Sequence, residues 1–112
     1  MIDPEEHALV VKALTSGLSN CVSWDEKAAR RVMESGLNPR SIKSETIDLV
    51  KSKGPSVLIQ KPETRDPWKD NYRFYYKVIL PSDVYRGGLF VEMILTDDDR
   101  EFPVVVFVNS HP

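Results

Sequence analysis

Apolar residues recur every three to four positions along the first half of the chain, and this spacing predicts helices. The first helix is expected to begin at Asp3, a capping residue followed by Pro4 and completed by Glu6 in a D-x-x-E capping box. Gly17 provides a stop signal. The apolar positions of this helix lie at helical spacing: Val10, Val11, Leu14 and Leu18.

A second helix is predicted with the same signals. Ser23 and Glu26 form its expected capping box, and Gly36 ends it. One arc of this helix carries Ala28, Ala29, Val32 and Met33, and the opposite arc carries Lys27, Arg30, Arg31 and Glu34. Asn38-Pro39 opens a third helical stretch that ends at Gly54, and Ser44 and Thr46 leave open whether it is one helix or two short ones.

After Gly54 the composition changes to that of β-strands. Strands are predicted at residues Val57–Lys61, Tyr72–Leu80, Leu89–Thr96 and Phe102–Asn109. Three helices followed by four strands with short connections predict an α+β domain with a mainly antiparallel sheet. We expect the helices to cover one face of that sheet and to leave the other face available for binding or catalysis.

Length and composition limit the alternatives. A chain of 112 residues with 41% hydrophobic and 29% charged residues fits one domain, residues 1–112. The longest apolar run, at 104–108, is too short to cross a membrane, and the acidic start does not resemble a secretory signal. The single cysteine, Cys21, fits a reducing compartment, so a cytoplasmic location without membrane association is predicted.

Charge is unevenly distributed although the net charge is only −2. Residues 1–26 carry a charge of −4, residues 27–86 carry +6, and residues 87–112 carry −4. The basic middle segment is able to form a local positive surface, or its charges interleave on solvated faces without forming a patch. No phosphate-binding loop, dinucleotide fingerprint, HExxH motif or paired CxxC motif occurs, so no cofactor and no metal ligand is predicted.

The strand Tyr72–Leu80 contains the first candidate site. Alternation places Arg73, Tyr75 and Lys77 on the face opposite the expected core residues Phe74, Tyr76, Val78 and Leu80. Two cations beside an aromatic ring suit a phosphodiester backbone and a stacked base. The alternative is a solvated sheet face on which the tyrosine packs against its basic neighbours.

His111 is the second candidate, as a group for proton transfer. If the last strand continues, alternation places Phe107, Asn109 and His111 on one side. A frayed chain end is the alternative. His7, on the first turn of the first helix, is expected at the surface. Basic residues of the second and third helices are candidates for RNA binding, with intrahelical pairing to Glu34 as the alternative for part of them: Arg30, Arg31, Arg40 and Lys43.

Several runs resemble a known family. The segment Ser23–Pro39 (SWDEKAARRVMESGLNP) resembles the "S-x-H-A-x-x-R-M-x-E-R-G-I" helix of small bacterial RelE-like domains grouped with the BrnT toxins. The run Tyr72–Val78 (YRFYYKV) is similar to that family's "R-Y-x-V-x-G" strand. The segments 89–98 and 104–112 are similar to its closing hairpin, and Trp68–Arg73 (WKDNYR) is loosely similar to MqsR-type toxins.

The resemblance implies a RelE-like fold and a toxin-type endoribonuclease, with RNA or the ribosome as its target and an antitoxin protein as its partner. In such a site we expect Arg73 and Lys77 to stabilise the charged phosphorane, Tyr75 to stack on a base and His111 to transfer a proton. The competing hypothesis is a non-catalytic module of the same fold that recognises a protein partner. The net negative charge and the lack of the family's helix histidine favour this alternative.

Overall fold

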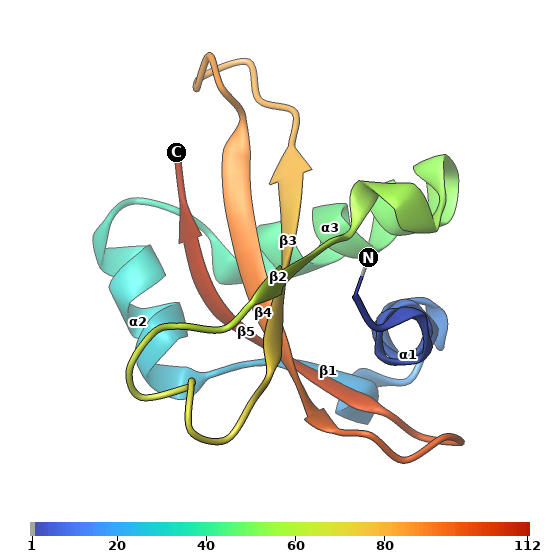
Figure 1. Ribbon diagram of the computed structural model, residues 1–112. Coiled ribbons are helices and arrows are strands. Elements are labelled where there is room, and N and C mark those ends of the chain that lie inside the picture. Colours follow the sequence, from blue (N-terminus) through green and yellow to red (C-terminus); the bar gives the residue numbers. More distant parts are fainter. Residues whose placement is uncertain (1) are drawn as a thin grey trace.

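The computed structural model describes residues 2–112 and has the α+β architecture expected from the sequence. Three α-helices and two 3-10 turns accompany a five-stranded sheet (Figure 1). The helices are α1 (Pro4–Thr15), α2 (Glu26–Glu34) and α3 (Pro39–Lys53). The strands are β1 (Val22–Trp24), β2 (Ile59–Pro62), β3 (Phe74–Leu80), β4 (Leu89–Asp97) and β5 (Val104–His111).

The sheet is mixed, and its strand order is β1-β5-β4-β3-β2. Three pairings are antiparallel, whereas β1 runs parallel to β5, with Val22 opposite Val105 and Trp24 opposite Phe107. The prediction of four strands is therefore wrong by one. The missing strand is β1, which has only three residues and follows a 3-10 turn at Ser19–Cys21. A segment this short shows no alternating pattern, and its extended form is fixed by pairing with β5.

Helix caps follow the sequence signals with one exception. The Asp3 carboxylate accepts a hydrogen bond from the amide of Glu6 at 3.1 Å, and Asn38 caps α3 in the same way through Ser41 at 3.2 Å. For α2 the cap is Asp25, whose carboxylate accepts a hydrogen bond from the amide of Ala28 at 3.0 Å. Ser23 does not cap the helix because it lies within strand β1. The third helix is continuous from Pro39 to Lys53, since the buried Thr46 hydroxyl donates to the carbonyl of Ile42 and leaves the helix unbroken.

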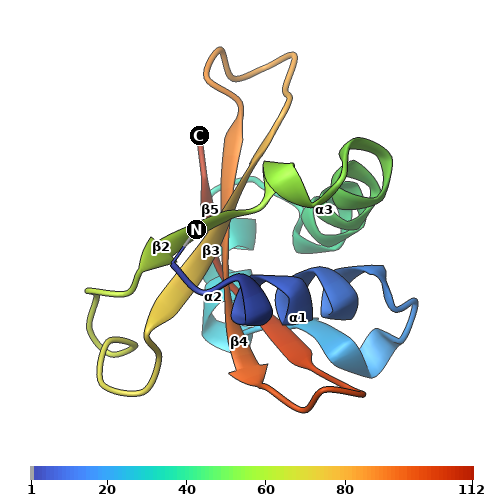
Figure 2. The same cartoon turned by 45° about the vertical axis from the view of Figure 1, so that its right-hand side comes forward.

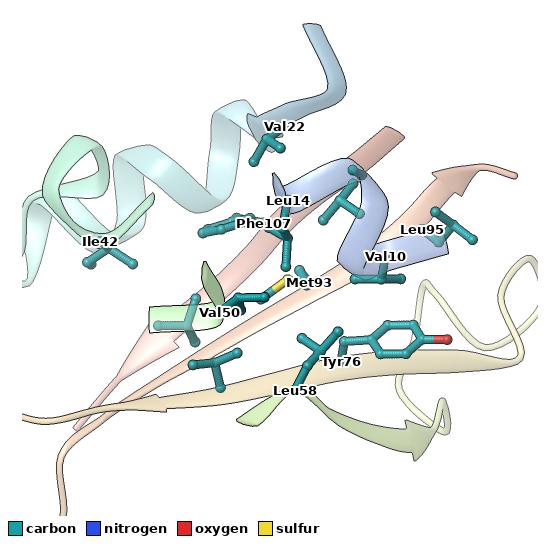
Figure 3. Close-up of a cluster of buried hydrophobic side chains, with 14 of the residues drawn as sticks. Val10, Leu14, Val22, Ile42, Val50, Leu58, Tyr76, Met93, Leu95 and Phe107 are labelled. Carbon is teal, nitrogen blue, oxygen red and sulfur yellow. The ribbon is translucent and has the colours of Figure 1, made fainter. Parts of the chain in front are cut away.

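The hydrophobic core lies between the sheet and the pair α1 and α3, which lie on the same side of it (Figure 2). The side chains that fill the core come from both layers and are buried (Figure 3). Tyr76 and Phe107, both fully buried, are the largest of them. The labelled core residues in Figure 3 are Val10, Leu14, Val22, Ile42, Val50, Leu58, Tyr76, Met93, Leu95 and Phe107. None of the helices described in residues 2–112 has the length and apolar character needed to span a bilayer.

Polar side chains attach α1 to the sheet. The Tyr76 hydroxyl donates to the carboxylate of Glu6 and accepts from the amide of Gln60 at 2.9 Å. Burial, followed by the hydrogen bond to Glu6, raises the pKa of Tyr76 far above its ordinary value, so the hydroxyl remains protonated. The prediction that His7 lies at the surface is wrong: its ring is buried, and Nε2 lies 2.8 Å from the carbonyl oxygen of Leu58.

Candidate functional site

The face of the sheet opposite α1 and α3, here called the open face, carries the polar residues of the candidate site. Alternation along β3 places Tyr75, Lys77 and Ile79 on the open face, where each is half-buried or exposed, whereas Phe74, Tyr76, Val78 and Leu80 are buried in the core. Opposite them, Lys77 pairs with Glu92 of β4 and Ile79 with Phe90. The segment between β2 and β3 projects from this side of the sheet (Figure 2).

A β-bulge decides which residues of β5 reach the open face. In the pairing with β4, Asn109 lies opposite Glu92 and Phe107 lies opposite Met93, so Val108 is the extra residue between two neighbouring positions of β4. Asn109 and His111 consequently share the open face, while Phe107 is fully buried in the core. The prediction that all three residues lie on one side is wrong for Phe107, since strict alternation does not continue through a bulge.

Glu92 is the centre of a connected polar group that we call the Glu92 cluster: Glu63, Arg65, Glu92, Asn109 and His111. One oxygen of Glu92 accepts from Arg65 at 3.0 Å, and the other accepts from the Asn109 amide at 3.0 Å. The second oxygen also lies 3.7 Å from Nε2 of His111. The side chain of Glu92 is only 9% exposed and that of His111 is 51% exposed, so a fixed carboxylate supports a solvent-accessible imidazole.

Arg65 holds the two acidic groups of the Glu92 cluster together. Its guanidinium binds both oxygens of Glu63, at 2.9 and 3.0 Å, and stacks over the Tyr75 ring with Cζ 4.1 Å from the centroid. Burial alone would raise the pKa of Glu63, but hydrogen bonds from the side chain and backbone of Arg65 outweigh it and hold the pKa below the ordinary value. Hydrogen bonding to Glu63 raises the pKa of Arg65 in turn.

Tyr75 remains a neutral hydroxyl. Burial is the main cause that raises its pKa, and the nearby Glu92 carboxylate adds to this effect. The residue is therefore suited to stacking or hydrogen-bond donation rather than to proton abstraction.

Lys77 and His111 approach the same hydrophobic ring. The Lys77 ammonium lies 5.2 Å from the centroid of Phe90, and the Phe90 and His111 rings are 5.3 Å apart at an angle of 45°. Three strands thus bring a cation, an aromatic ring and an imidazole next to each other on the open face. Lys77 of β3 and His111 of β5 lie on the two strands that flank Phe90 of β4.

Arg73 does not share this arrangement. It precedes β3, its guanidinium lies 3.9 Å from the Asp3 carboxylate that caps α1, and its Cζ lies 5.0 Å from the ring of the core residue Phe74. The prediction that Arg73 accompanies Tyr75 and Lys77 on one face is therefore wrong. The alternating pattern does not extend to Arg73 because the strand begins one residue later.

The predicted RNA-binding residues are divided between two parts of the molecule. Arg31 donates to the carbonyl of Val108 at 3.2 Å and so reaches the bulge of β5, next to the open face. Arg30 is exposed and lies 3.9 Å from Glu26. Arg40 and Lys43 belong to α3, and Lys43 lines a small hollow beside the end of α1, in the helical layer. Residues 2–112 contain no group of three or more His, Cys, Asp or Glu side chains arranged to hold a metal ion.

Comparisons with protein-family models, curated proteins and solved structures found no match for this chain.

The sequence reasoning missed Glu63, Arg65, Glu92 and Asn109. One signal was available for Glu92, which is the only charged residue in the otherwise apolar run Leu89–Leu95. A carboxylate at a central strand position needs a partner, and this requirement points to a buried polar cluster. Glu63 and Arg65 lie outside the strands, and no sequence pattern connects them to a residue that lies 27 positions from Arg65.

The protonation of Glu63 gives the first testable prediction, which concerns stability in acid. The pKa of the Glu63 carboxyl is lower in the folded protein than its ordinary value of 4.5. The charged carboxylate therefore stabilises the fold fully above about pH 4.5, and this contribution is lost as the pH falls below that value. We expect the free energy of unfolding of Glu63→Gln to depend less steeply on pH below 4.5 than that of the wild type. Urea unfolding at a series of pH values measures this slope.

The exposed Glu45→Gln on α3 serves as the matched control, since it removes the same charge from the surface. It should retain the acid sensitivity of the wild type. Equal slopes for wild type and Glu63→Gln would show that the contact with Arg65 does not make the stability of the protein depend on the protonation of Glu63.

Proposed function

We propose that this protein is a metal-independent endoribonuclease of the RelE-like toxin type, acting on single-stranded RNA in the cytoplasm. The observation that carries the proposal is the position of Lys77 and His111 on either side of Phe90, with the Glu92 carboxylate 3.7 Å from the imidazole. RNA cleavage without a metal requires a group that accepts the 2′-hydroxyl proton and a cation near the phosphorane. Both are present on one accessible surface.

In the proposed reaction the imidazole of His111 accepts the proton of the ribose 2′-hydroxyl while O2′ forms a bond to the adjacent phosphorus. The bond from phosphorus to O5′ breaks, and the leaving oxygen takes its proton from solvent. The Lys77 ammonium stabilises the negative charge on the non-bridging oxygens. The products are an RNA with a 2′,3′-cyclic phosphate and an RNA with a 5′-hydroxyl.

The remaining residues have supporting roles. Glu92 is a positioning residue: its second oxygen faces Nε2 of His111, and the hydrogen bonds from Arg65 and Asn109 hold that oxygen in place. Tyr75, stacked beneath Arg65, offers its ring and neutral hydroxyl to a base. Arg73 has no catalytic role in this mechanism because its guanidinium lies beside the α1 cap rather than on the open face.

The test uses the purified full-length protein and a 5′-labelled single-stranded RNA in the presence of EDTA. We expect cleavage products that end in a 2′,3′-cyclic phosphate, and we expect growth arrest when the protein is expressed alone. Intact RNA, both free and ribosome-bound, together with normal growth would overturn the proposal. That result would instead support a non-catalytic module that uses the open face to bind a protein.

A further inference from the structure

A pocket of about 590 Å³ lies beside the Glu92 cluster, between the start of α2 and the segment that connects β2 to β3. Its volume falls within the range of roughly 300–1,000 Å³ that is typical of small-ligand sites. The pocket is lined by Asp25, Glu26, Lys27, Arg31, Asp66, Pro67, Trp68 and Val108. Two of them adjoin the Glu92 cluster directly along the chain, since Asp66 follows Arg65 and Val108 precedes Asn109.

One wall of this pocket is aromatic. Trp68 is half-buried, and its ring packs against Tyr72 with centroids 6.2 Å apart. The segment around Trp68 is closed by two backbone hydrogen bonds to the carbonyl of Arg65, from Trp68 at 2.9 Å and from Lys69 at 2.8 Å. The indole is therefore held on a segment that Arg65 attaches to the sheet, and a planar ligand can stack against it.

The side of the pocket formed by the start of α2 carries two cations, Lys27 and Arg31, beside two carboxylates, Asp25 and Glu26. Lys27 and Arg31 lie four residues apart on α2 and so share a face of that helix. Within residues 2–112 neither side chain forms a salt bridge, whereas the acidic Asp66 and Glu26 have Lys69 and Arg30 as partners at 3.5 and 3.9 Å. Arg31 is held in place by the hydrogen bond that it donates to the carbonyl of Val108, another residue of the lining. Asp25, the remaining acidic residue of the lining, caps α2 by accepting a hydrogen bond from the amide of Ala28 at 3.0 Å, so Lys27 and Arg31 are the cations that the pocket offers to an anion.

We propose that this pocket binds one nucleotide of a single-stranded RNA, with the base stacked on Trp68 and a backbone phosphate between Lys27 and Arg31. A pocket lined by an indole and by two cations without salt-bridge partners among residues 2–112 fits a ligand that is both planar and anionic. This inference rests on the proposed function in one respect: it places the bound nucleotide next to the phosphodiester that His111 would cleave. A purine offers the larger stacking surface and is the preferred occupant.

The experiment measures binding of a fluorescently labelled 2′-O-methyl oligoadenylate, which has no free 2′-hydroxyl and therefore is not cleaved. We expect Trp68→Leu to weaken binding by about fivefold to a hundredfold, as is typical for the loss of one stacked base. Trp68→Phe, which retains an aromatic wall, should recover most of the affinity. Lys27→Gln together with Arg31→Gln should weaken binding and reduce its dependence on salt.

The matched control is Lys51→Gln with Lys53→Gln, which removes two positive charges at the exposed end of α3, in the layer on the other side of the sheet. It should leave affinity unchanged. Equal binding by wild type, Trp68→Leu and the α2 double variant would overturn the pocket assignment, even if RNA is cleaved. Tight, Trp68-dependent binding by a protein that does not cleave RNA would instead overturn the proposed nuclease and leave the pocket in place.

Discussion

Replacing His111 by alanine is expected to slow cleavage of single-stranded RNA by about a hundredfold to ten-thousandfold, the usual effect of removing a group that transfers a proton. The imidazole is half-exposed at the end of β5, so the substitution removes little packing. The rate of cleavage of the 5′-labelled RNA by wild type and variant, followed over time in the presence of EDTA, measures this difference.

Two further variants separate chemistry from packing. His111→Phe keeps a ring beside Phe90 but cannot transfer a proton, and it should be as slow as His111→Ala. Glu92→Gln preserves the shape of the side chain and removes the charge next to Nε2, so it should slow cleavage less than His111→Ala does. A His111→Ala protein that cleaves RNA at the wild-type rate would remove His111 from the mechanism.

Replacing Arg65 by methionine is expected to lower the free energy of unfolding by about 3 kcal/mol, because it leaves two carboxylates without their cation. The side chains of Glu63 and Glu92 are 0% and 9% exposed, so neither can recover its hydration in the folded protein. Urea denaturation of the wild type and the variant at neutral pH measures this difference.

The matched control is Arg30→Met, which breaks a salt bridge between side chains that are 65% and 91% exposed. An exposed pair of this kind contributes about 0–1 kcal/mol, so the control should unfold close to the wild type. Adding Glu63→Gln and Glu92→Gln to Arg65→Met should restore part of the loss, since the uncompensated charges are then gone. An Arg65→Met protein as stable as Arg30→Met would show that the Glu92 cluster is hydrated rather than buried.

The helices and the longer strands could be predicted because their signals are local. Asp3, Asn38 and Gly54 act through hydrogen bonds and backbone angles within a few residues, and the alternation of β3 reports directly which residues face the core. These features require no knowledge of distant segments. The α+β class followed from the order of these elements.

The features that were missed depend on distant partners. The short strand β1 is extended because it pairs with β5, more than 80 positions further along the chain, where Val22 meets Val105. The bulge at Val108 results from the register between β4 and β5, and it decides that Phe107 enters the core while Asn109 and His111 do not. Likewise, the choice of Asp25 over Ser23 as the cap of α2 depends on that same pairing of β1.

The position of β5 inside the sheet, between β1 and β4, has a consequence for synthesis of the protein. During translation β1 and β4 emerge from the ribosome before β5; until residues 104–111 have followed, β1 has no neighbour in the sheet and β4 can pair only with β3. Asn109 and His111 arrive with that same strand. A nascent chain therefore cannot present a formed site, and its assembly coincides with closure of the sheet.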